Sequence, residues 1–219
     1  MTDKLIAALA HEYPLVPLDI GEFSMLKVNG MKFTLKTYHA EGLGHVSVMR
    51  AKGFFGLMQM DTVMVVPFER DLPLYSYDRI HAMGNDTLII ELYDTVTEPL
   101  DLAELDGVKE KFSHLPDRDP GEHWYDSIKL PQSVSKKGKK AITQEFDALT
   151  LAHFDAYVLA PAGKVTDRAK KKALSTAYVD GLLKHGGPST DIFKKELGIE
   201  TTERLFRTVL FGTALDREA

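Results

Sequence analysis

After a short N-terminal segment, the hydrophobic pattern of this chain changes from a strand period to a helical period, and that change constrains the fold more than any other feature. Over residues 31–36 (Met-Lys-Phe-Thr-Leu-Lys) apolar and polar side chains alternate, as they do in a half-buried strand. Beyond Pro99 the apolar residues recur every three to five positions, which is typical of helices with one buried face. Strands followed by helices favour an α+β fold over alternating βαβ units, so we expect a largely antiparallel sheet.

The same pattern predicts the elements and their order. A short amphipathic helix is expected over 3–12. Strands are expected over 31–36, 45–50, 57–66 and 87–93, with a turn at 84–86 (Gly-Asn-Asp) before the last of them. Helices are expected over 102–112, 141–159, 164–185 and 190–197, followed by a final helix capped by Thr201 or Thr202. Nothing between these elements is long enough to be a linker, so we expect one domain over 1–219.

Composition excludes several classes of protein. The chain has no cysteine, which rules out disulfides, thiol nucleophiles and cysteine-ligated zinc or iron–sulfur sites. Electrons handled by the protein would therefore come from outside or from an organic cofactor. A net charge of −5 argues against nucleic acid as a partner. No stretch approaches the ~20 apolar residues of a membrane helix, and the N-terminus lacks signal-peptide features, so we expect a cytoplasmic protein without a membrane partner.

Familiar site motifs are missing. The run 42–44 (Gly-Leu-Gly) is half of a dinucleotide fingerprint, but a strand pattern follows it where a helix is needed. No P-loop, His-Glu-x-x-His or Gly-x-Ser-x-Gly motif occurs. The eight histidines do not have metal-ligand spacing, so no metal site is expected.

One polar segment is unusual for its position. Residues 71–78 (Asp-Leu-Pro-Leu-Tyr-Ser-Tyr-Asp) carry two acids and two tyrosines between apolar strands. An acid that faces a protein core is costly unless it is protonated or paired. The segment is therefore either an ordinary polar turn or a functional site.

Two lysine-rich clusters also stand out in an acidic chain. They are Lys136, Lys137, Lys139 and Lys140, and Lys164, Arg168, Lys170, Lys171 and Lys172. They are interpreted either as solvated helix starts or as a docking surface for an acidic partner.

The segment 61–78 (DTVMVVPFERDLPLYSYD) resembles the central stretch of the ferredoxin-dependent bilin reductases, the family of the phycocyanobilin and phycoerythrobilin:ferredoxin oxidoreductases. In that family a strand leads through a proline to Asp-Leu-Pro, here 71–73, and the catalytic aspartate follows five residues later, here Asp78. Weaker similarities lie around Trp124 and over 193–211, which resembles the C-terminal helix of the family.

The resemblance implies a fold and a reaction. The family fold is a three-layer α/β/α sandwich around an antiparallel sheet. Its members reduce biliverdin-type linear tetrapyrroles with single electrons from ferredoxin, in phycobilin biosynthesis, without a bound metal, flavin or other cofactor. The bilin lies between the sheet and the C-terminal helices. Asp78 is then the expected proton donor, because burial raises the pKa of a carboxyl group. Asp61 stands where some members have a histidine on the neighbouring strand, and we expect it to be its catalytic partner.

The remaining site residues are expected from substrate chemistry. The two propionates of a bilin need cationic partners. The candidates are Arg50, Lys52 and Lys129. Tyr75 and Tyr77 are candidates for substrate contact, although core aromatics would explain them equally. A second acid of several members falls near Gly187, so a shifted loop would make Asp191 or Asp180 its replacement.

Two other functions stay open from the sequence. The fold could bind a tetrapyrrole without turning it over. It could also reduce another open-chain tetrapyrrole, as the related red chlorophyll catabolite reductases do.

Overall fold

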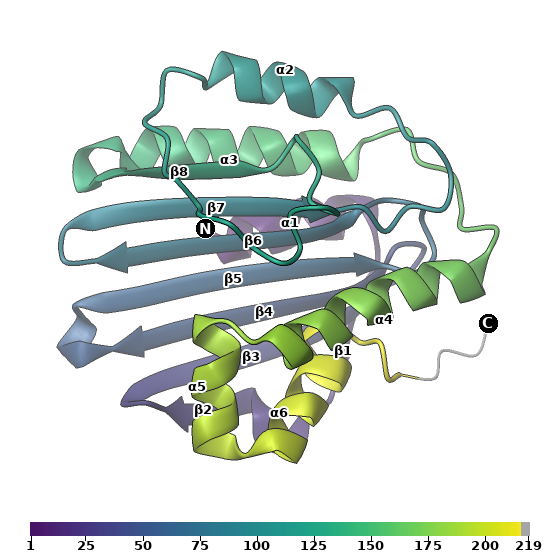
Figure 1. Cartoon of the computed structure of the whole chain (residues 1–219). Helices are drawn as coiled ribbons and strands as arrows, with labels where there is room; N and C mark the ends of the chain where they lie inside the picture. Colours follow the sequence, from purple (N-terminus) through teal and green to yellow (C-terminus); the bar gives the residue numbers. More distant parts are fainter. Residues whose placement is uncertain (216–219) are drawn as a thin grey trace.

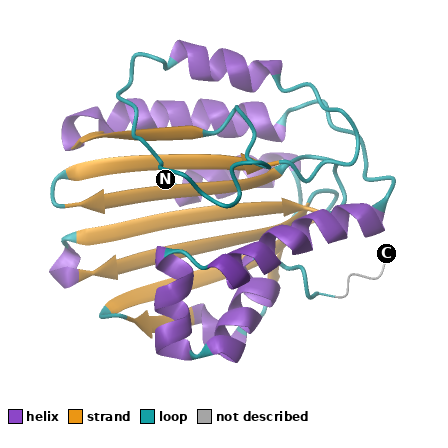
Figure 2. Cartoon of the chain, in the orientation of Figure 1, coloured by secondary structure: helices purple, strands orange, loops and turns teal. Residues whose placement is uncertain are grey.

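The computed structural model describes residues 1–215, which form one eight-stranded sheet between two layers of helices (Figures 1 and 2). The strands are β1 (Leu15–Leu18), β2 (Met25–Val28), β3 (Met31–Ala40), β4 (Gly44–Gly53), β5 (Met58–Pro67), β6 (Leu74–Ala82), β7 (Asn85–Tyr93) and β8 (Val134–Lys139). They are ordered β1-β3-β4-β5-β6-β7-β8, with β2 also paired to β3. Each of these pairs is antiparallel.

Helices cover both faces of this sheet. The α-helices are α1 (Thr2–Glu12), α2 (Ala103–Lys111), α3 (Thr143–Val158), α4 (Arg168–His185), α5 (Pro188–Leu197) and α6 (Ile199–Arg204). Short turns of other helix types are η1 (Gly21–Ser24), η2 (Phe54–Gly56), η3 (Lys140–Ile142) and the π-helical η4 (Leu205–Leu210). Side chains of α1, α2 and α3 pack on one face, and those of α4, α5 and η4 pack on the other. The expected α+β sandwich around an antiparallel sheet is confirmed.

The two faces differ in how completely they are covered. On the side of α1 and α3, Val63, Val65, Tyr75 and Tyr77 are fully buried, and we call this the closed face. On the side of α4, many strand residues are buried as well, but several side chains of the central strands keep part of their surface exposed, and we call this the half-open face. Its partly exposed apolar side chains are Met60, Met64, Ile80 and Ile89.

The segment suspected of being a polar turn is mostly a strand. β6 begins at Leu74, and Asp78 lies near its middle, paired with β5 and β7 on both sides. The sequence pattern hid this strand because Ser76 and Asp78 alternate with tyrosines, so both sets of positions look mixed. The turn before β7 is also shifted: it consists of Met83 and Gly84, both with positive φ, and 85–86 already belong to β7.

The cap expected for the last helix is wrong. Thr201 and Thr202 lie inside α6, and Gly198 precedes its first residue. The Thr202 hydroxyl donates a hydrogen bond to the Gly198 carbonyl at 2.8 Å, so it bonds back within the helix and does not cap it.

The Asp-Leu-Pro motif links α4 to the sheet. Asp71 accepts hydrogen bonds from the backbone of Thr97 at 2.9 Å and of Glu98 at 3.0 Å. Lys171 of α4 is fully buried, and its Nζ lies 3.1 Å from Asp71 Oδ1 and 2.5 Å from the Leu72 carbonyl oxygen. The motif therefore fixes α4 to the start of β6, the strand that carries Asp78.

Within the described part of the chain, no helix combines the length and the apolar character that crossing a bilayer requires.

Candidate functional site

Asp78 lies on the half-open face, in the sheet layer that α4 covers. Strand register puts Thr62 of β5 directly opposite it on one side and Ile89 of β7 on the other. The Thr62 hydroxyl donates a hydrogen bond to Asp78 Oδ1 at 2.5 Å. This hydrogen bond holds the carboxyl group in place on the half-open face, which also carries the partly exposed apolar side chains.

The surroundings of Asp78 favour its neutral form. Burial raises its pKa to about 6, and the nearby Glu91 carboxylate adds to the rise, while the hydrogen bond from Thr62 opposes it. A carboxyl group with this pKa is still partly protonated at neutral pH, to about one tenth at pH 7, far more than an ordinary aspartate. It can therefore act as a general acid.

Glu91 is a second acid on the same face, and the sequence analysis missed it. It lies on β7 opposite Ser76, so it is a diagonal neighbour of Asp78. The Tyr93 hydroxyl donates a hydrogen bond to Glu91 Oε2 at 2.6 Å. Once β6 is recognised as a strand, both neighbours follow from the register. Thr62 is the residue opposite Asp78 on β5, and Glu91 is two residues along β7 from the residue opposite Asp78.

Aromatic rings pack beside these acids. Tyr93 lies 4.1 Å from Tyr178 of α4 and 5.4 Å from Tyr125, measured between ring centroids. Burial raises the pKa of Tyr93 and Tyr178 well above the ordinary value, so both hydroxyls stay protonated. Trp124 joins the group 5.9 Å from Tyr178. We call Tyr93, Trp124, Tyr125 and Tyr178 the aromatic cluster.

Trp124 depends on a glycine in α4. A Cβ atom at Gly181 would lie 2.2 Å from the Trp124 ring, so any other residue would push the indole away. Among the described residues the buried Trp124 Nε1 has no hydrogen-bond partner. Buried donors are normally satisfied, so this N–H is an exception among the described side chains.

Asp61 does not join Asp78. The two residues lie on neighbouring strands, but Asp61 is opposite Arg79 in the register and points to the closed face. The place beside Asp78 is taken by Thr62, one residue further along β5. The expected pairing of Asp61 with Asp78 is therefore corrected: a shift by one residue turns a side chain to the other face of a sheet.

Tyr75 and Tyr77 are also on the closed face. Tyr75 packs against Phe154 and Tyr157 of α3 at centroid distances of 5.3 and 4.6 Å. Both tyrosines are fully buried. They occupy the core between the sheet and α3 and do not contact the face that carries Asp78.

The three candidate cations lie in different places. Arg50 Nε donates a hydrogen bond to Thr2 Oγ1 at 2.7 Å, and the guanidinium pairs with Asp3, which attaches α1 to the closed face. Lys52 is exposed near the end of β4. Lys129 lies 5.7 Å from the Tyr125 ring centroid and pairs with Asp126 at 2.5 Å. Lys129 is the one of the three that adjoins the aromatic cluster.

The candidate acids of the C-terminal helices have partners of their own, away from Asp78. Asp191 lies in the first turn of α5 and accepts a hydrogen bond from the Gly187 N–H at 3.4 Å. Asp180 pairs with Arg207 at 2.6 Å. Glu91 is thus the acid that the described structure brings next to Asp78.

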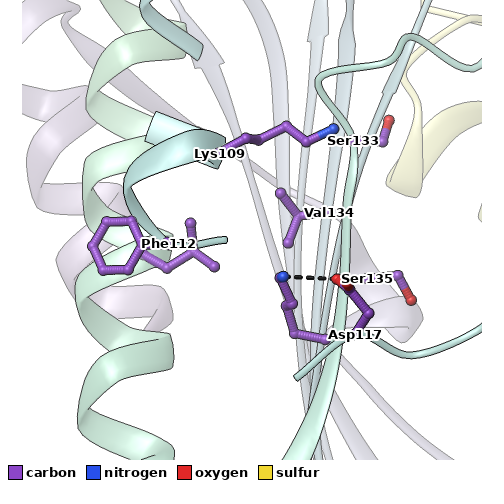
Figure 3. A pocket seen from close by; sticks show the side chains of 8 residues that line it. Lys109, Phe112, Asp117, Ser133, Val134 and Ser135 are labelled. Atoms are coloured by element: carbon purple, nitrogen blue, oxygen red, sulfur yellow. Dashed lines mark ion pairs between the residues drawn. The ribbon is translucent and has the colours of Figure 1, made fainter. Parts of the chain in front are cut away.

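A pocket of about 110 Å³ lies away from Asp78, on the side of the closed face (Figure 3). It is lined by Lys109, Phe112, Asp117, Ser133, Val134, Ser135, Lys136 and Leu149. Lys136 Nζ pairs with Asp117 at 2.7 Å and donates to the Leu115 carbonyl, and Lys109 donates to the Pro131 carbonyl. Both ammonium groups are already bound, so this pocket does not compete as the candidate site.

Comparison with known proteins supports the fold. No protein-family model matches the chain, and no curated protein matches it. Among solved structures, the tomato phytochromobilin synthase in complex with biliverdin is similar, with a TM-score of 0.74 and 15% sequence identity, over 100% of this chain and 86% of that one. At this identity the similarity shows a shared fold.

Proposed function

We propose that this protein is a ferredoxin-dependent reductase of a linear tetrapyrrole of the biliverdin class. The observation that carries the proposal is Asp78: an acid with a pKa of about 6 on the half-open face of a fold that it shares with a biliverdin-binding synthase. Partly exposed apolar side chains surround it and the aromatic cluster lies near its neighbour Glu91, which suits a flat, conjugated ligand.

The chemistry follows from charge balance. Reduction of one double bond adds two electrons and two protons. Each electron from ferredoxin turns the bilin into a stronger base, and Asp78 then donates a proton to it. Because Asp78 is partly exposed, it can take up a new proton from water between the two transfers. This scheme needs no metal or flavin.

Neighbouring residues have distinct roles in this proposal. The negative charge of Glu91 raises the pKa of Asp78 and so keeps the proton on it. The hydrogen bond from Thr62 orients the carboxyl group. Of the three candidate cations, Lys129 is the one best placed to pair with a propionate.

The test is anaerobic incubation with biliverdin and a reduced ferredoxin system, followed by absorbance. Wild type should convert the pigment. Asp78→Asn should bind it with a similar spectrum but form product at least ~100-fold more slowly, because an amide cannot donate the proton. A bilin radical should then accumulate and give an electron paramagnetic resonance signal.

The same substitution on the closed face provides the comparison. Asp61→Asn should slow turnover much less than Asp78→Asn, since Asp61 points away from the proposed bilin surface. Binding of biliverdin without any ferredoxin-driven change would leave the alternative of a non-catalytic tetrapyrrole-binding protein. Wild-type rates in Asp78→Asn would remove Asp78 from the mechanism.

A further inference from the structure

Exposed apolar side chains gather at one end of the sheet. Because the strands are antiparallel, the β2–β3, β4–β5 and β6–β7 turns share this end, at the left-hand edge of Figure 1. Met58 pairs with Ala82, so the second and third turns are adjacent. Their tips carry four exposed side chains: Phe54 (54% exposed), Phe55 (108%), Leu57 (67%) and Met83 (89%). We call this region the hairpin end.

Three of these exposed apolar residues also have a backbone conformation that costs free energy. Phe54, Phe55 and Met83 have φ values of 51°, 55° and 50°, in the left-handed region. A residue with a Cβ atom pays roughly 1 kcal/mol or more there, and hairpin turns of this kind favour Asn and Gly. The neighbouring β2–β3 turn follows that preference with Asn29 and Gly30. Large apolar residues thus occupy turn positions where Asn or Gly would be better suited to both backbone and solvent.

Lysines flank the apolar tips on both sides. Lys27, Lys32 and Lys52 lie directly opposite one another in a row across β2, β3 and β4, and all three are exposed. Like charges in directly opposite positions destabilise a sheet. On the other side, Lys139 donates a hydrogen bond to Asn85 at 2.9 Å, next to the β6–β7 turn, and Lys140 follows it.

The one acid at this end of β7 does not neutralise these lysines. Asp86 is fully buried and accepts hydrogen bonds from Arg79 at 2.5 and 2.6 Å. Across the strands, the hairpin end therefore presents a row of lysines, then the exposed apolar turns, and then a second pair of lysines. Exposed apolar groups with a charged rim mark interaction surfaces, and the positive rim calls for an acidic partner.

We infer that the hairpin end is the docking surface for an acidic one-electron carrier protein. The inference rests on the proposed function, which requires such a donor. Met83 is five residues from Asp78 along β6, roughly 16 Å, and the partly exposed Ile80 lies between them. A carrier bound at the tips would therefore lie close to a bilin over Asp78.

The structure also separates the two lysine clusters of the sequence. Lys164 pairs with Arg70, just beyond the last residue of β5, so the second cluster is at the opposite end of the sheet. In that cluster Lys171 is buried against Asp71, and in the first cluster Lys136 is buried against Asp117. Lys139 and Lys140 are the members of either cluster that adjoin the exposed apolar turns.

Binding can be tested without turnover, by calorimetry at low salt with a plant-type [2Fe–2S] ferredoxin and no bilin. The variant Phe55→Asn/Met83→Asn removes the apolar tips and places residues suited to left-handed backbone, so its fold should not suffer. The variant Lys52→Glu/Lys139→Glu reverses the rim charge. Each should weaken ferredoxin binding by about tenfold or more. The matched control Lys164→Glu/Lys172→Glu should bind within about twofold of wild type.

Contrary results would be plain. Unchanged ferredoxin binding by both hairpin-end variants would overturn the inference. It would also be overturned if the variants lost binding to phosphatidylglycerol vesicles but kept their affinity for ferredoxin. Reduction of biliverdin by chemically reduced methyl viologen tests the proposed function separately. If that reaction proceeds but the wild type binds no ferredoxin, the docking inference and the ferredoxin dependence both fail, while reduction of the bilin at Asp78 stands.

Discussion

At the scale of single residues, the candidate site is decided by the direction of side chains on a strand. Asp61 and Asp78 are both acids on adjacent strands, but the pair Thr62–Asp78 is in register and the pair Asp61–Asp78 is one residue out of it. Alternation then sends the two carboxylates to opposite faces. One face is filled by α3, and the other stays partly exposed. Asp78 can therefore meet a ligand, whereas Asp61 cannot without rearrangement.

The pKa of Asp78 predicts how activity depends on pH. Since its pKa is raised to about 6, turnover should fall as pH rises above that value and the proton is lost. Thr62→Val removes a hydrogen bond to the carboxylate, so it should move the falling limb to higher pH. Glu91→Gln removes a neighbouring negative charge, so it should move the limb to lower pH. Rates measured from pH 5 to 9 test these opposite shifts, and shifts of the same sign would contradict the assignment.

Stability should respond to the same group. Folding raises the pKa of Asp78 from 3.8 to about 6, so the stability linked to its protonated form is present below pH 3.8 and lost as pH rises through 6. At pH 8 the wild type carries a partly buried carboxylate. Asp78→Asn should therefore increase the free energy of unfolding at pH 8 relative to pH 5, measured by urea denaturation. An equal effect at both pH values would indicate that burial does not shift this pKa.

At the scale of elements, the position of α4 depends on a buried ion pair. Burial alone would push the pKa of Asp71 upward, but hydrogen bonds from Thr97 and Lys171 lower it overall, so the carboxylate is charged at neutral pH. The Asp71–Lys171 pair links two segments one hundred residues apart in the sequence. The Asp-Leu-Pro motif thus supports the site through the packing of α4, not through contact with Asp78.

Removing one partner of this pair should be costly. Lys171→Met leaves the Asp71 carboxylate buried without its cation, which should lower the free energy of unfolding by about 3 kcal/mol. Urea denaturation at pH 7 measures the loss. Lys172→Met, at the adjacent exposed position, should change stability by less than about 0.5 kcal/mol. Equal effects of the two variants would show that the buried pair contributes little.

The contact between α4 and Trp124 gives a second prediction for this element. Gly181→Ala improves helix propensity by about 1 kcal/mol, but its methyl group would overlap the indole, so the variant should still be less stable than wild type. Trp124 is the only tryptophan in the sequence, so fluorescence reports on it alone. Its emission should shift to longer wavelength as the ring becomes more exposed. An unchanged spectrum with higher stability would contradict this packing.

At the scale of the whole molecule, the two helical layers have different tasks. The layer of α1, α2 and α3 completes a closed core, in which Tyr75, Phe154 and Tyr157 are fully buried. The layer of α4, α5 and η4 leaves the central strands partly exposed around Asp78. One face of the sheet is therefore a closed core, and the other keeps exposed surface around Asp78.

This division predicts the footprint of the ligand. Biliverdin should slow amide hydrogen exchange mainly in α4 and in the parts of β5, β6 and β7 near Asp78, because these segments border the half-open face. Exchange in α1 and α3 should change little. Hydrogen-exchange mass spectrometry with and without biliverdin makes the comparison. Protection confined to α1 and α3 would place the ligand on the closed face and refute the proposed site.

The sequence alone determined the class of fold. The change from period two to helical spacing predicted a sheet followed by helices, because burial of apolar side chains imposes those periods locally. The resemblance carried by the segment 61–78 singled out Asp78 as the expected proton donor. The helices over 141–159 and 164–185 were also recognised, since their apolar faces and glycine stop are local signals.

Only the tertiary structure decided which residues surround Asp78. Glu91, Thr62 and Tyr178 reach it from two other strands and from a helix, and no local pattern states the register that brings them together. The same register turned Asp61, Tyr75 and Tyr77 away. It also placed Phe55, Met83 and the lysine row at one end of the sheet. Pairing between distant segments depends on the packing of the whole chain. A shift of one residue in the register of a strand exchanges the two faces of that strand, and no local sequence pattern reveals the register.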